Sequence, residues 1–393
     1  MREAALKIVK TLQDNGFVAV FAGGFVRDML LGRESNDIDV ATSATPQQVL
    51  DLFPHSILDG FSEGVIKVIT DKVVTDVATL RLDSNASNGR KPDSVEFTNS
   101  LKADSRRRDF SINSMYFDPI SEELFDFHGG QEDLRREVIT TVGDPSDRFQ
   151  EDALRMLRAI RFSCQLGFRL DFDLSQSCRD LKHLVNNLSA ERVRDEFFKI
   201  LSSDRAKYGI GELIHTGLLQ EILPEVSVHR KFAGLHLLAL GGVDVETRFA
   251  SLFLNQFEAA DACNRLKLSG AQFHKVITLL EQLDFAHDAT NLKQAALVNM
   301  MRGKHFPYLA GLQFAQAKAM GLPDHLDFFV AKSKELRTLV LAPPLLDGND
   351  LIAAGLKPGP LFKTMLDWIR REQDSGRIST CEQALEMLFT VHE

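Results

Sequence analysis

A strand–turn–helix–strand pattern near the N-terminus constrains the fold of this chain more than any other feature. Residues 17–22 are apolar and rich in β-formers, and the diglycine Gly23-Gly24 follows them directly. The short apolar-rich segment 26–31 predicts a helix, and residues 38–41 predict a second strand. This order indicates an α/β unit in which a glycine turn leads from a buried strand into a short helix.

Two aspartates mark the start of the second predicted strand. Asp37 and Asp39 are spaced i, i+2, so on a strand their side chains point to the same face. Two carboxylates that close repel each other, and Mg²⁺ removes this cost because it takes oxygen ligands and shares them with substrate phosphates. A lone Asp-x-Asp is usually a solvated strand end. Beside a glycine turn, however, the pair favours nucleotidyl transfer by a two-metal mechanism.

The composition is typical of a globular protein of two to four domains. The chain has 393 residues, of which 44% are hydrophobic and 26% charged. It shows no apolar run of 18 residues and no signal-peptide pattern, so we expect no membrane span and a cytoplasmic location. The four cysteines show no metal-ligand spacing. The net charge of −9 argues against a protein that coats nucleic acid, although a basic cluster lies at residues 106–108.

The fold class predicted for the chain is α+β, with a mixed head followed by an all-helical remainder. Residues 1–145 mix strand and helix signals, and segments 65–70 and 73–80 predict a hairpin that turns at Asp71-Lys72. The polar residues 83–93 predict a loop. Beyond residue 147 the pattern is helical, and the clearest helices are predicted at 151–167, 190–201, 272–283 and 360–374.

Two further motifs of the head carry candidate site residues. Asp76, on the second strand of the hairpin, is a candidate third carboxylate that positions metal or deprotonates a hydroxyl; a solvated strand residue is the alternative. The run RRDFSIN places Arg108 beside Asp109. Arginines bind phosphate oxygens bidentately, and a nearby Asp or Asn can hydrogen-bond ribose hydroxyls. A charged helix start is the alternative, but the position downstream of the aspartate pair favours a nucleotide site.

A predicted helix at 151–162 combines a hydrogen-bond acceptor with a stripe of arginines. Asp152 and Arg155 are i, i+3 neighbours, and Arg158 and Arg161 continue the stripe across roughly 120° of the helix. Such a stripe is usually a solvated face with ion pairs. Here the Asp–Arg pair is suited to reading the Watson–Crick edge of a base, and the two following arginines are suited to holding a triphosphate.

Six motifs follow one another in a specific order over the first 200 residues. They are GGFVRDMLLG with DIDVAT, TDVATLR, RRDFSIN, FDFHGGQEDL, RFQEDALRMLRAIRF and ERVRDEFFKIL. Together they resemble the class II tRNA nucleotidyltransferase / poly(A) polymerase family of the DNA polymerase β-type superfamily, and residues 344–360 resemble its tail domain. The resemblance implies a polymerase β-like nucleotidyltransferase head with a mixed sheet (1–145), a helical neck that recognises the base (146–205), a helical body (206–335) and a helical tail that binds tRNA (336–393).

The resemblance also implies roles for the candidate residues. Asp37 and Asp39 would bind two Mg²⁺ ions, with Asp76 as the candidate third carboxylate. Asp152 and Arg155 would pair with the base of CTP or ATP. The full nucleotide site would comprise Gly23, Gly24, Arg27, Arg108, Asp109, Asp152, Arg155, Arg158 and Arg161. Support for the base-reading helix would come from Glu191, Arg194 and Glu196.

The activity that the resemblance implies is template-independent, Mg²⁺-dependent addition of C, C and A to tRNA 3′ ends. The expected partners are CTP, ATP and the acceptor stem and elbow of tRNA, and the oligomeric state is left open. A poly(A) polymerase or an enzyme that adds only the terminal A shares these motifs, and a non-catalytic RNA-binding relative is the alternative from another class. Leu254-Asn255 replace a His-Asp pair of some bacterial members, so we expect no second metal site and no phosphohydrolase activity.

Overall fold

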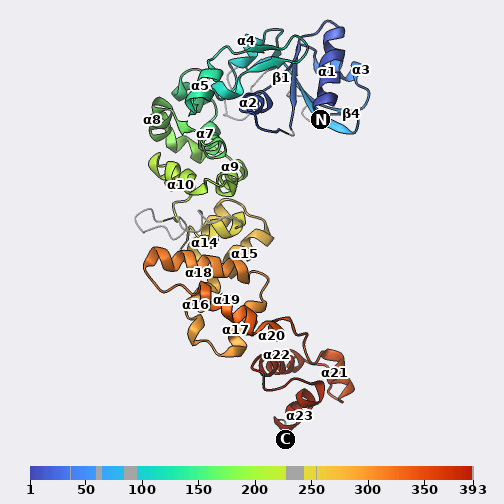
Figure 1. The fold of residues 1–393 in the computed structure, drawn as a ribbon, viewed down its shortest axis with the longest axis vertical. Coiled ribbons are helices and arrows are strands. Elements are labelled where there is room, and N and C mark those ends of the chain that lie inside the picture. The colour runs from blue at the N-terminus through green and yellow to red at the C-terminus, as the bar shows by residue number, and fades with distance from the viewer. Residues whose placement is uncertain (36, 59–63, 84–94, 227–242, 254, 392–393) are drawn as a thin grey trace. The chain divides into compact units, whose positions relative to one another are not determined.

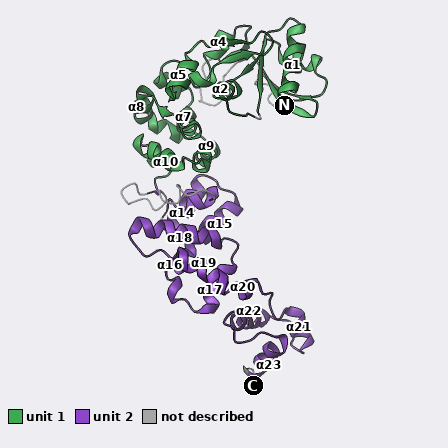
Figure 2. Cartoon of the chain, in the orientation of Figure 1, with its two compact units in different colours: residues 1–224 green, residues 225–393 purple. Residues whose placement is uncertain are grey.

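The protein consists of two compact units. The computed structural model describes residues 1–35, 37–58, 64–83, 95–226, 243–253 and 255–391, and the other residues are drawn as a thin grey trace in Figure 1. The units comprise residues 1–224 and 225–393 (Figure 2). All but one residue of the predicted loop at 83–93, and also Leu254, lie outside the described residues. Within the described residues, no helix is both long and apolar enough to cross a membrane.

A seven-stranded mixed sheet forms the centre of the first unit, as the sequence predicted for the head. Its strand order is β3-β4-β5-β2-β1-β8-β9. Strands β2 and β5 run parallel, and the other neighbouring pairs run antiparallel. The strands are β1 (Ala19–Ala22), β2 (Asp39–Thr42), β3 (Ser56–Ile57), β4 (Val65–Thr70), β5 (Val73–Thr79), β8 (Tyr116–Asp118) and β9 (Glu123–Phe125).

The predicted hairpin of the head is confirmed. Strands β4 and β5 pair antiparallel from Val65 opposite Ala78 to Thr70 opposite Val73. Asp71 and Lys72 connect them with φ values of 53° and 66°. Positive φ at both central residues is the geometry of a two-residue turn whose twist matches that of the strands. This turn fixes the register that places Asp76 on β5.

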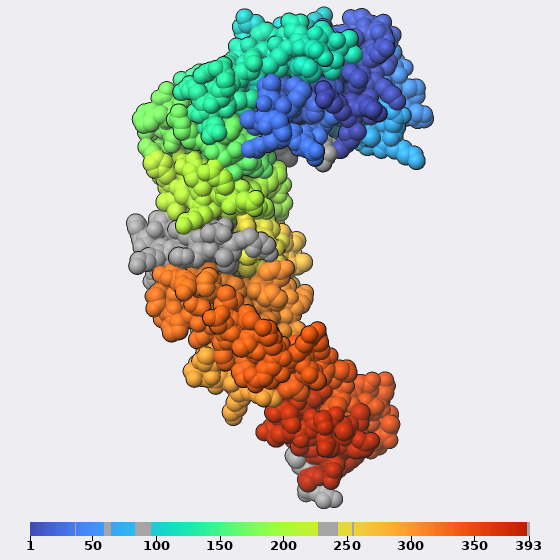
Figure 3. All heavy atoms as spheres, in the orientation of Figure 1, coloured from blue at the N-terminus to red at the C-terminus, as the bar shows by residue number. Residues whose placement is uncertain are grey.

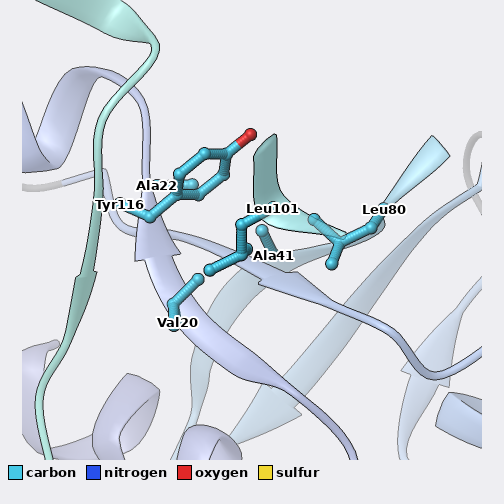
Figure 4. Close-up of a cluster of buried hydrophobic side chains, with 6 residues drawn as sticks. All are labelled: Val20, Ala22, Ala41, Leu80, Leu101 and Tyr116. Atoms are coloured by element: carbon cyan, nitrogen blue, oxygen red, sulfur yellow. The ribbon is translucent and has the colours of Figure 1, made fainter. Parts of the chain in front are cut away.

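An apolar cluster lies on the face of the sheet that carries Asp39. It consists of Val20, Ala22, Ala41, Leu80, Leu101 and Tyr116, each at most 9% exposed (Figure 4). Because alternate residues of a strand share a face, Asp39 lies on the same face as Ala41. The carboxylate of Asp39 therefore stands beside an apolar cluster, which limits its contact with water.

Helices make up most of the remainder of the first unit. They are α1 (Arg2–Asp14), α2 (Gly24–Leu30), α3 (Pro46–Leu52), α4 (Leu101–Ser105), η2 (Ser111–Asn113), α5 (Gly130–Arg136), α6 (Pro145–Glu151), α7 (Leu154–Leu166), α8 (Phe172–Leu181), η3 (Lys182–Asn187), α9 (Ala190–Ser202), α10 (Ala206–His215) and α11 (Leu218–Ile222). Two short strand pairs accompany them, namely β6 (Arg81–Asp83) with β7 (Val95–Phe97), and β10 (Val138–Ile139) with β11 (Arg169–Leu170).

The continuous helix predicted at 151–167 is wrong at its start. Helix α6 ends at Glu151, Asp152 is extended with φ −149° and ψ 102°, and α7 begins at Leu154. The physical reason is that Oδ1 of Asp152 accepts a hydrogen bond from the backbone N–H of Leu154 at 3.0 Å. Aspartate side chains compete with the helix for backbone N–H groups in this way. Arg155, however, lies on α7 with the rest of the predicted stripe.

The described part of the second unit is helical, as predicted. Its helices are α13 (Val245–Ala250), α14 (Gln256–Arg265), α15 (Gly270–Glu281), α16 (Leu283–His287), η4 (Ala289–Asn291), α17 (Gln294–Arg302), α18 (Phe306–Met320), α19 (Leu326–Glu335), α20 (Arg337–Leu341), α21 (Gly348–Ala353), α22 (Leu361–Asp374) and α23 (Cys381–Val391). Leu351, Ile369 and Leu388 belong to a separate buried cluster at its C-terminal end. Figure 3 shows both units with all heavy atoms. The division into head, neck, body and tail stays a prediction.

Candidate active site

At the diglycine turn, backbone without side chains lies close to one carboxylate and two guanidinium groups. Gly23 follows β1 with φ 67° and ψ −132°, which residues with a side chain rarely adopt. A Cβ atom on Gly23 would lie 3.2 Å from Nη1 of Arg108 and 3.8 Å from Oδ2 of Asp39. Gly24 begins α2, and a Cβ atom there would lie 3.6 Å from Nη2 of Arg27. Five predicted site residues therefore meet at this turn.

Asp39 and Asp76 lie on the same face of two adjacent strands. The parallel pairing of β2 with β5 aligns Ala41 with Ala78. Asp39 is two residues before Ala41, and Asp76 is two residues before Ala78. Since alternate residues of a strand share a face, the two carboxylates are neighbours across the strands. Asp37 precedes β2 by two residues.

These three carboxylates repel one another. Burial raises the pKa of Asp39 to about 6, and the charges of Asp37 and Asp76 add to this shift, while Arg108 and Lys67 oppose it. Like charges that gather in a partly buried site disfavour ionisation. A bound divalent cation would reverse this effect, because it would be the largest local charge in the site.

The carboxylates fit a divalent metal. In the described part of the chain, no lysine or arginine lies within ion-pair distance of Asp37 or Asp39, whereas Nζ of Lys67 lies 2.9 Å from Oδ1 of Asp76. The described residues contain no group of three or more His, Cys, Asp or Glu side chains that would hold a metal by themselves. Mg²⁺ is usually held by one or two carboxylates, together with water and substrate phosphates, so the Asp37–Asp39 pair has the expected composition.

A buried network fixes the orientation of Arg108. Its Nε donates to the Tyr116 hydroxyl at 3.1 Å, and its Cζ lies 4.7 Å from the centre of the Tyr116 ring. The Tyr116 hydroxyl donates to Oδ2 of Asp104 at 2.6 Å. Although burial by itself would raise it, the guanidinium groups of Arg107 and Arg108 hold the pKa of Asp104 below its usual value. Arg108 is therefore presented to Gly23 in a defined position.

Asp109 connects arginines of two helices through Asn113. Nε and Nη2 of Arg158, on α7, donate to Oδ2 of Asp109 at 2.9 and 2.5 Å. The Asn113 side chain donates to Oδ1 of Asp109 at 3.2 Å and accepts from Nη1 of Arg27, on α2, at 2.7 Å. Four side chains that the sequence places in three different motifs thus form one hydrogen-bonded chain.

The side chains of Asp152 and Arg155 are each held by a different partner and make no hydrogen bond to each other, although the backbone N–H of Arg155 donates to the backbone carbonyl of Asp152 at 3.0 Å. Nη2 of Arg192, on α9, donates to Oδ2 of Asp152 at 2.8 Å. Nη1 of Arg155 donates to Oε2 of Glu151 at 2.7 Å, and Nη2 donates to the backbone carbonyl of Arg107 at 3.2 Å. An acceptor and a donor fork are therefore present at the start of α7, each oriented by its own ion pair.

Two arginines at this site were missed as site residues by the sequence reasoning. Arg192 pairs with Asp152, although the resemblance pointed to its neighbours in the same motif. Arg148 is buried, and its Nη2 donates to the backbone carbonyls of Arg107 and Arg108 at 2.8 and 3.1 Å. The only sequence signal for either residue was its place inside a motif.

Glu196 contacts the stripe on α7. One of its carboxylate oxygens lies 3.2 Å from Nε of Arg161, which is itself buried. Arg194 forms an ion pair with the adjacent Asp195 at 2.9 Å. Glu196 is thus placed to support α7 through Arg161, and the supporting role of this motif stays a prediction.

Comparisons with known proteins agree with this arrangement. The family model described as the poly A polymerase head domain matches residues 19–140. The model described as the probable RNA and SrmB- binding site of polymerase A matches residues 167–229. A CCA-adding enzyme of Bacillus pumilus is 45% identical over 393 residues, which cover 98% of this chain and 96% of the relative.

Solved structures share the fold along the chain. The crystal structure of the Bacillus stearothermophilus CCA-adding enzyme in complex with CTP has a TM-score of 0.78 and 28% identity, over 99% of this chain and 98% of that chain. The Thermotoga maritima CCA-adding enzyme complexed with tRNA-CCA has a TM-score of 0.71 and 20% identity, over 100% of this chain and 95% of that chain. Because the identity to the Bacillus pumilus relative extends over nearly the whole of both sequences, this chain belongs to the family of CCA-adding enzymes, which are tRNA nucleotidyltransferases.

Proposed function

We propose that this chain adds C, C and A to the 3′ end of tRNA without a nucleic-acid template, using CTP and ATP and releasing pyrophosphate. The observation that carries the proposal is the convergence of carboxylates and arginines on the turn at Gly23. The related Bacillus stearothermophilus enzyme forms a complex with CTP, and the Thermotoga maritima enzyme forms one with tRNA-CCA. These are the two substrate classes that the reaction requires.

The carboxylates supply the reaction centre. The tRNA 3′-hydroxyl attacks the α-phosphate in line, and pyrophosphate leaves from the opposite side. Enzymes of this family use a divalent metal. In this chain, Asp37 and Asp39 would hold two Mg²⁺ ions. When bound, such ions lower the pKa of the attacking hydroxyl and neutralise charge that develops on the phosphate. Asp76, next to Asp39 on the sheet, takes the role of a third carboxylate that accepts the proton of the hydroxyl.

The arginines and the glycine turn bind the sugar–phosphate part of the nucleotide. The backbone at Gly23 and Gly24 lets the triphosphate approach closely, because a side chain there would occupy that space. Guanidinium groups bind phosphate oxygens through paired N–H donors. In this role we place Arg27, Arg108, Arg158 and Arg161, with Asp109 beside the ribose.

Asp152 and Arg155 select the base. A carboxylate accepts hydrogen bonds only, and a guanidinium only donates them. Cytosine and adenine both present an exocyclic amino donor, whereas thymine, like uracil, presents a carbonyl acceptor at the same place. Asp152 would accept from the amino group and Arg155 would donate to the neighbouring ring acceptor. The pair would therefore accept C and A and reject U.

The domain roles extend the same proposal. Residues 1–145 carry the chemistry, 146–205 recognise the base, 206–335 form the helical body, and the helical tail 336–393 binds tRNA. A cytoplasmic location stays a prediction from the sequence.

A primer-extension gel tests the activity. Three tRNA transcripts, ending before CCA, at C and at CC, are incubated with the protein, Mg²⁺ and CTP, ATP or both. We expect a defined stop at CCA on all three. Addition of a single A to the CC-ending transcript alone would make the chain an A-adding enzyme. A long ATP-dependent ladder would make it a poly(A) polymerase.

Two variants separate catalysis from base selection in the same gel. Asp37→Ala should abolish extension while tRNA binding persists, because the metal site is lost and the helical segments are not. Arg155→Ala should admit UTP and lower the preference for CTP and ATP. A correctly folded Asp37→Ala protein with full activity would contradict the metal assignment, and unchanged selectivity in Arg155→Ala would contradict the base assignment.

A further inference from the structure

Phe162, on α7, lies against the guanidinium groups of three predicted site residues. The Cζ atoms of Arg161, Arg27 and Arg158 lie 4.1, 5.3 and 5.5 Å from the centre of its ring. Arg27 comes from α2 in the head, and the other two come from α7 itself. The Phe162 ring is almost fully buried, at 8% exposure. An aromatic ring attracts cations to its face because of its quadrupole, and more strongly when water is excluded.

Each of these arginines also has its own carboxylate partner. Arg27 binds Asp28 through two hydrogen bonds of 2.9 Å. Arg158 binds Asp109, and Arg161 binds Glu196. The three carboxylates come from α2, from the residues just before η2, and from α9, whereas the three guanidinium groups all lie within 5.5 Å of the centre of the Phe162 ring.

Like charges are crowded at this place. Burial lowers the pKa of the Arg161 guanidinium, and the positive charges of Arg158 and Arg27 add to the shift, while Glu196 and Asp109 oppose it. Three arginines this close repel one another unless something between them compensates. The three carboxylate partners offset part of this repulsion, and a ring that attracts all three guanidinium groups holds them together without adding a further negative charge.

We infer that Phe162 is a positioning residue that gathers Arg27, Arg158 and Arg161 for the triphosphate of the incoming nucleotide. The inference rests on the proposed function, since it assumes that CTP and ATP bind at these arginines. Pre-oriented donors lose less conformational freedom when the ligand binds, so affinity depends on the ring. The property that matters is the electron density of the ring face, not only its volume.

The test varies that density at constant size. Phenylalanine carrying one, two or three fluorine atoms is placed at position 162, because fluorine weakens cation–π attraction and leaves the ring shape nearly unchanged. Dissociation constants for CTP and ATP are measured in Mg²⁺ by equilibrium dialysis. We expect them to rise with each fluorine, to about tenfold for three. Phe162→Leu should give dissociation constants like those of the trifluorinated protein. Phe162→Tyr should keep dissociation constants close to those of the wild type.

Phe110 provides the matched control. It packs edge-on against Phe162, with ring centres 5.7 Å apart, and among the described residues no guanidinium lies over its ring. The same fluorinated series at position 110 should leave both dissociation constants unchanged. In steady-state assays, KM for CTP should rise with fluorination at 162 more than kcat falls.

The outcomes are distinguishable. If the wild-type protein binds CTP and ATP but fluorination at position 162 leaves both dissociation constants unchanged, the role of the Phe162 ring is overturned and the proposed function is not. Wild-type protein that binds neither CTP nor ATP would overturn the proposed function and this role with it. If Phe162→Leu fails to fold, the fluorinated series still decides, because it keeps the ring in the core.

Discussion

The Asp109 carboxylate and the Arg158 guanidinium join two motifs that are 49 residues apart in the sequence. Two nitrogens of Arg158 donate to the same oxygen of Asp109, whose side chain is only 11% exposed. Although burial by itself would raise it, the charge and hydrogen bonds of Arg158 hold the pKa of Asp109 below its usual value. The pair thus ties the segment just before η2 to α7.

Asp109→Asn should lower both stability and nucleotide affinity. The substitution keeps the shape but removes the charge opposite Arg158, whose side chain is 33% exposed and so is only partly screened by water. We expect a loss of about 1–3 kcal/mol, below the value for a fully buried pair. Thermal unfolding of the single variants and of the double variant with Arg158→Gln measures the coupling between the two side chains.

A surface pair supplies the control for this cycle. Lys7 and Asp71 form an ion pair in the same unit, with side chains that are 62% and 57% exposed. Asp71→Asn should leave the melting temperature almost unchanged, because exposed pairs contribute little. Equal effects of the two Asp→Asn changes would show that Asp109 and Arg158 add no more than a surface ion pair does.

The raised pKa of Asp39 predicts an unusual pH dependence of the metal-free protein. Its pKa is about 6 in the folded protein against an ordinary value of 3.8, so the folded state holds the proton more tightly. The contribution of the Asp39 carboxyl to the free energy of unfolding is therefore fully present below pH 3.8 and is lost as the pH rises through 6. Asp39→Asn should stabilise the metal-free protein at pH 8 by at most about 3 kcal/mol.

Thermal unfolding in a chelator, at pH values from 4 to 8, checks this expectation. The advantage of Asp39→Asn should shrink toward pH 4, where the wild-type carboxyl is protonated as well. Added Mg²⁺ at pH 8 should then raise the melting temperature of the wild type and not that of the variant. A variant that is less stable than the wild type at pH 8 without metal would show that the carboxylates do not repel each other.

The local parts of this site could be predicted from the sequence because they depend on short-range rules. The glycine turn, the spacing of Asp37 and Asp39, and the hairpin that places Asp76 each follow from residues within one strand or turn. The arginine stripe on α7 likewise follows from helical periodicity. These features need no knowledge of what packs against them.

The remaining parts of the site depend on contacts between distant segments. The break at Asp152 interrupts a segment with good helical periodicity, and it is decided by one side-chain hydrogen bond to Leu154. Arg192 and Asp152 are 40 residues apart, so their pairing depends on how α9 packs against α7. The gathering of arginines at Phe162 also requires α2 of the head to meet α7, which periodicity does not reveal.

Arg192→Ala should reduce the accuracy of base selection more than the rate. Its guanidinium holds Oδ2 of Asp152, and without it only the Leu154 N–H holds the carboxylate that we propose reads the base. We expect misincorporation of UTP to rise about tenfold while extension with CTP and ATP continues, in line with the value of one well-placed base contact. Arg135→Ala, which removes an exposed pair with Glu132 on α5, is the control and should change neither quantity. Wild-type fidelity in Arg192→Ala would remove Arg192 from the site.

Gly130→Ala should disturb the site indirectly, through the packing of α5 against η2. Gly130 begins α5, and a Cβ atom there would lie 2.5 Å from the backbone carbonyl oxygen of Ser111, in η2. The oxygen is part of the backbone, so η2 or α5 must shift, and η2 includes Asn113 of the chain between Arg158 and Arg27. We expect the free energy of unfolding to fall by about 1–3 kcal/mol, which lowers the melting temperature, and CTP to bind more weakly.

Gly270→Ala separates this steric effect from the general effect of replacing a glycine. Gly270 begins α15 in the second unit, has no positive φ, and a Cβ atom there would meet nothing within 4 Å. Its replacement should leave CTP binding unchanged and keep or slightly raise stability, because alanine restricts the unfolded chain. If Gly130→Ala behaved like Gly270→Ala in both measurements, α5 would have to move away from η2 without disturbing Asn113. In that case the close packing of α5 would have no part in orienting Asp109 and the arginines.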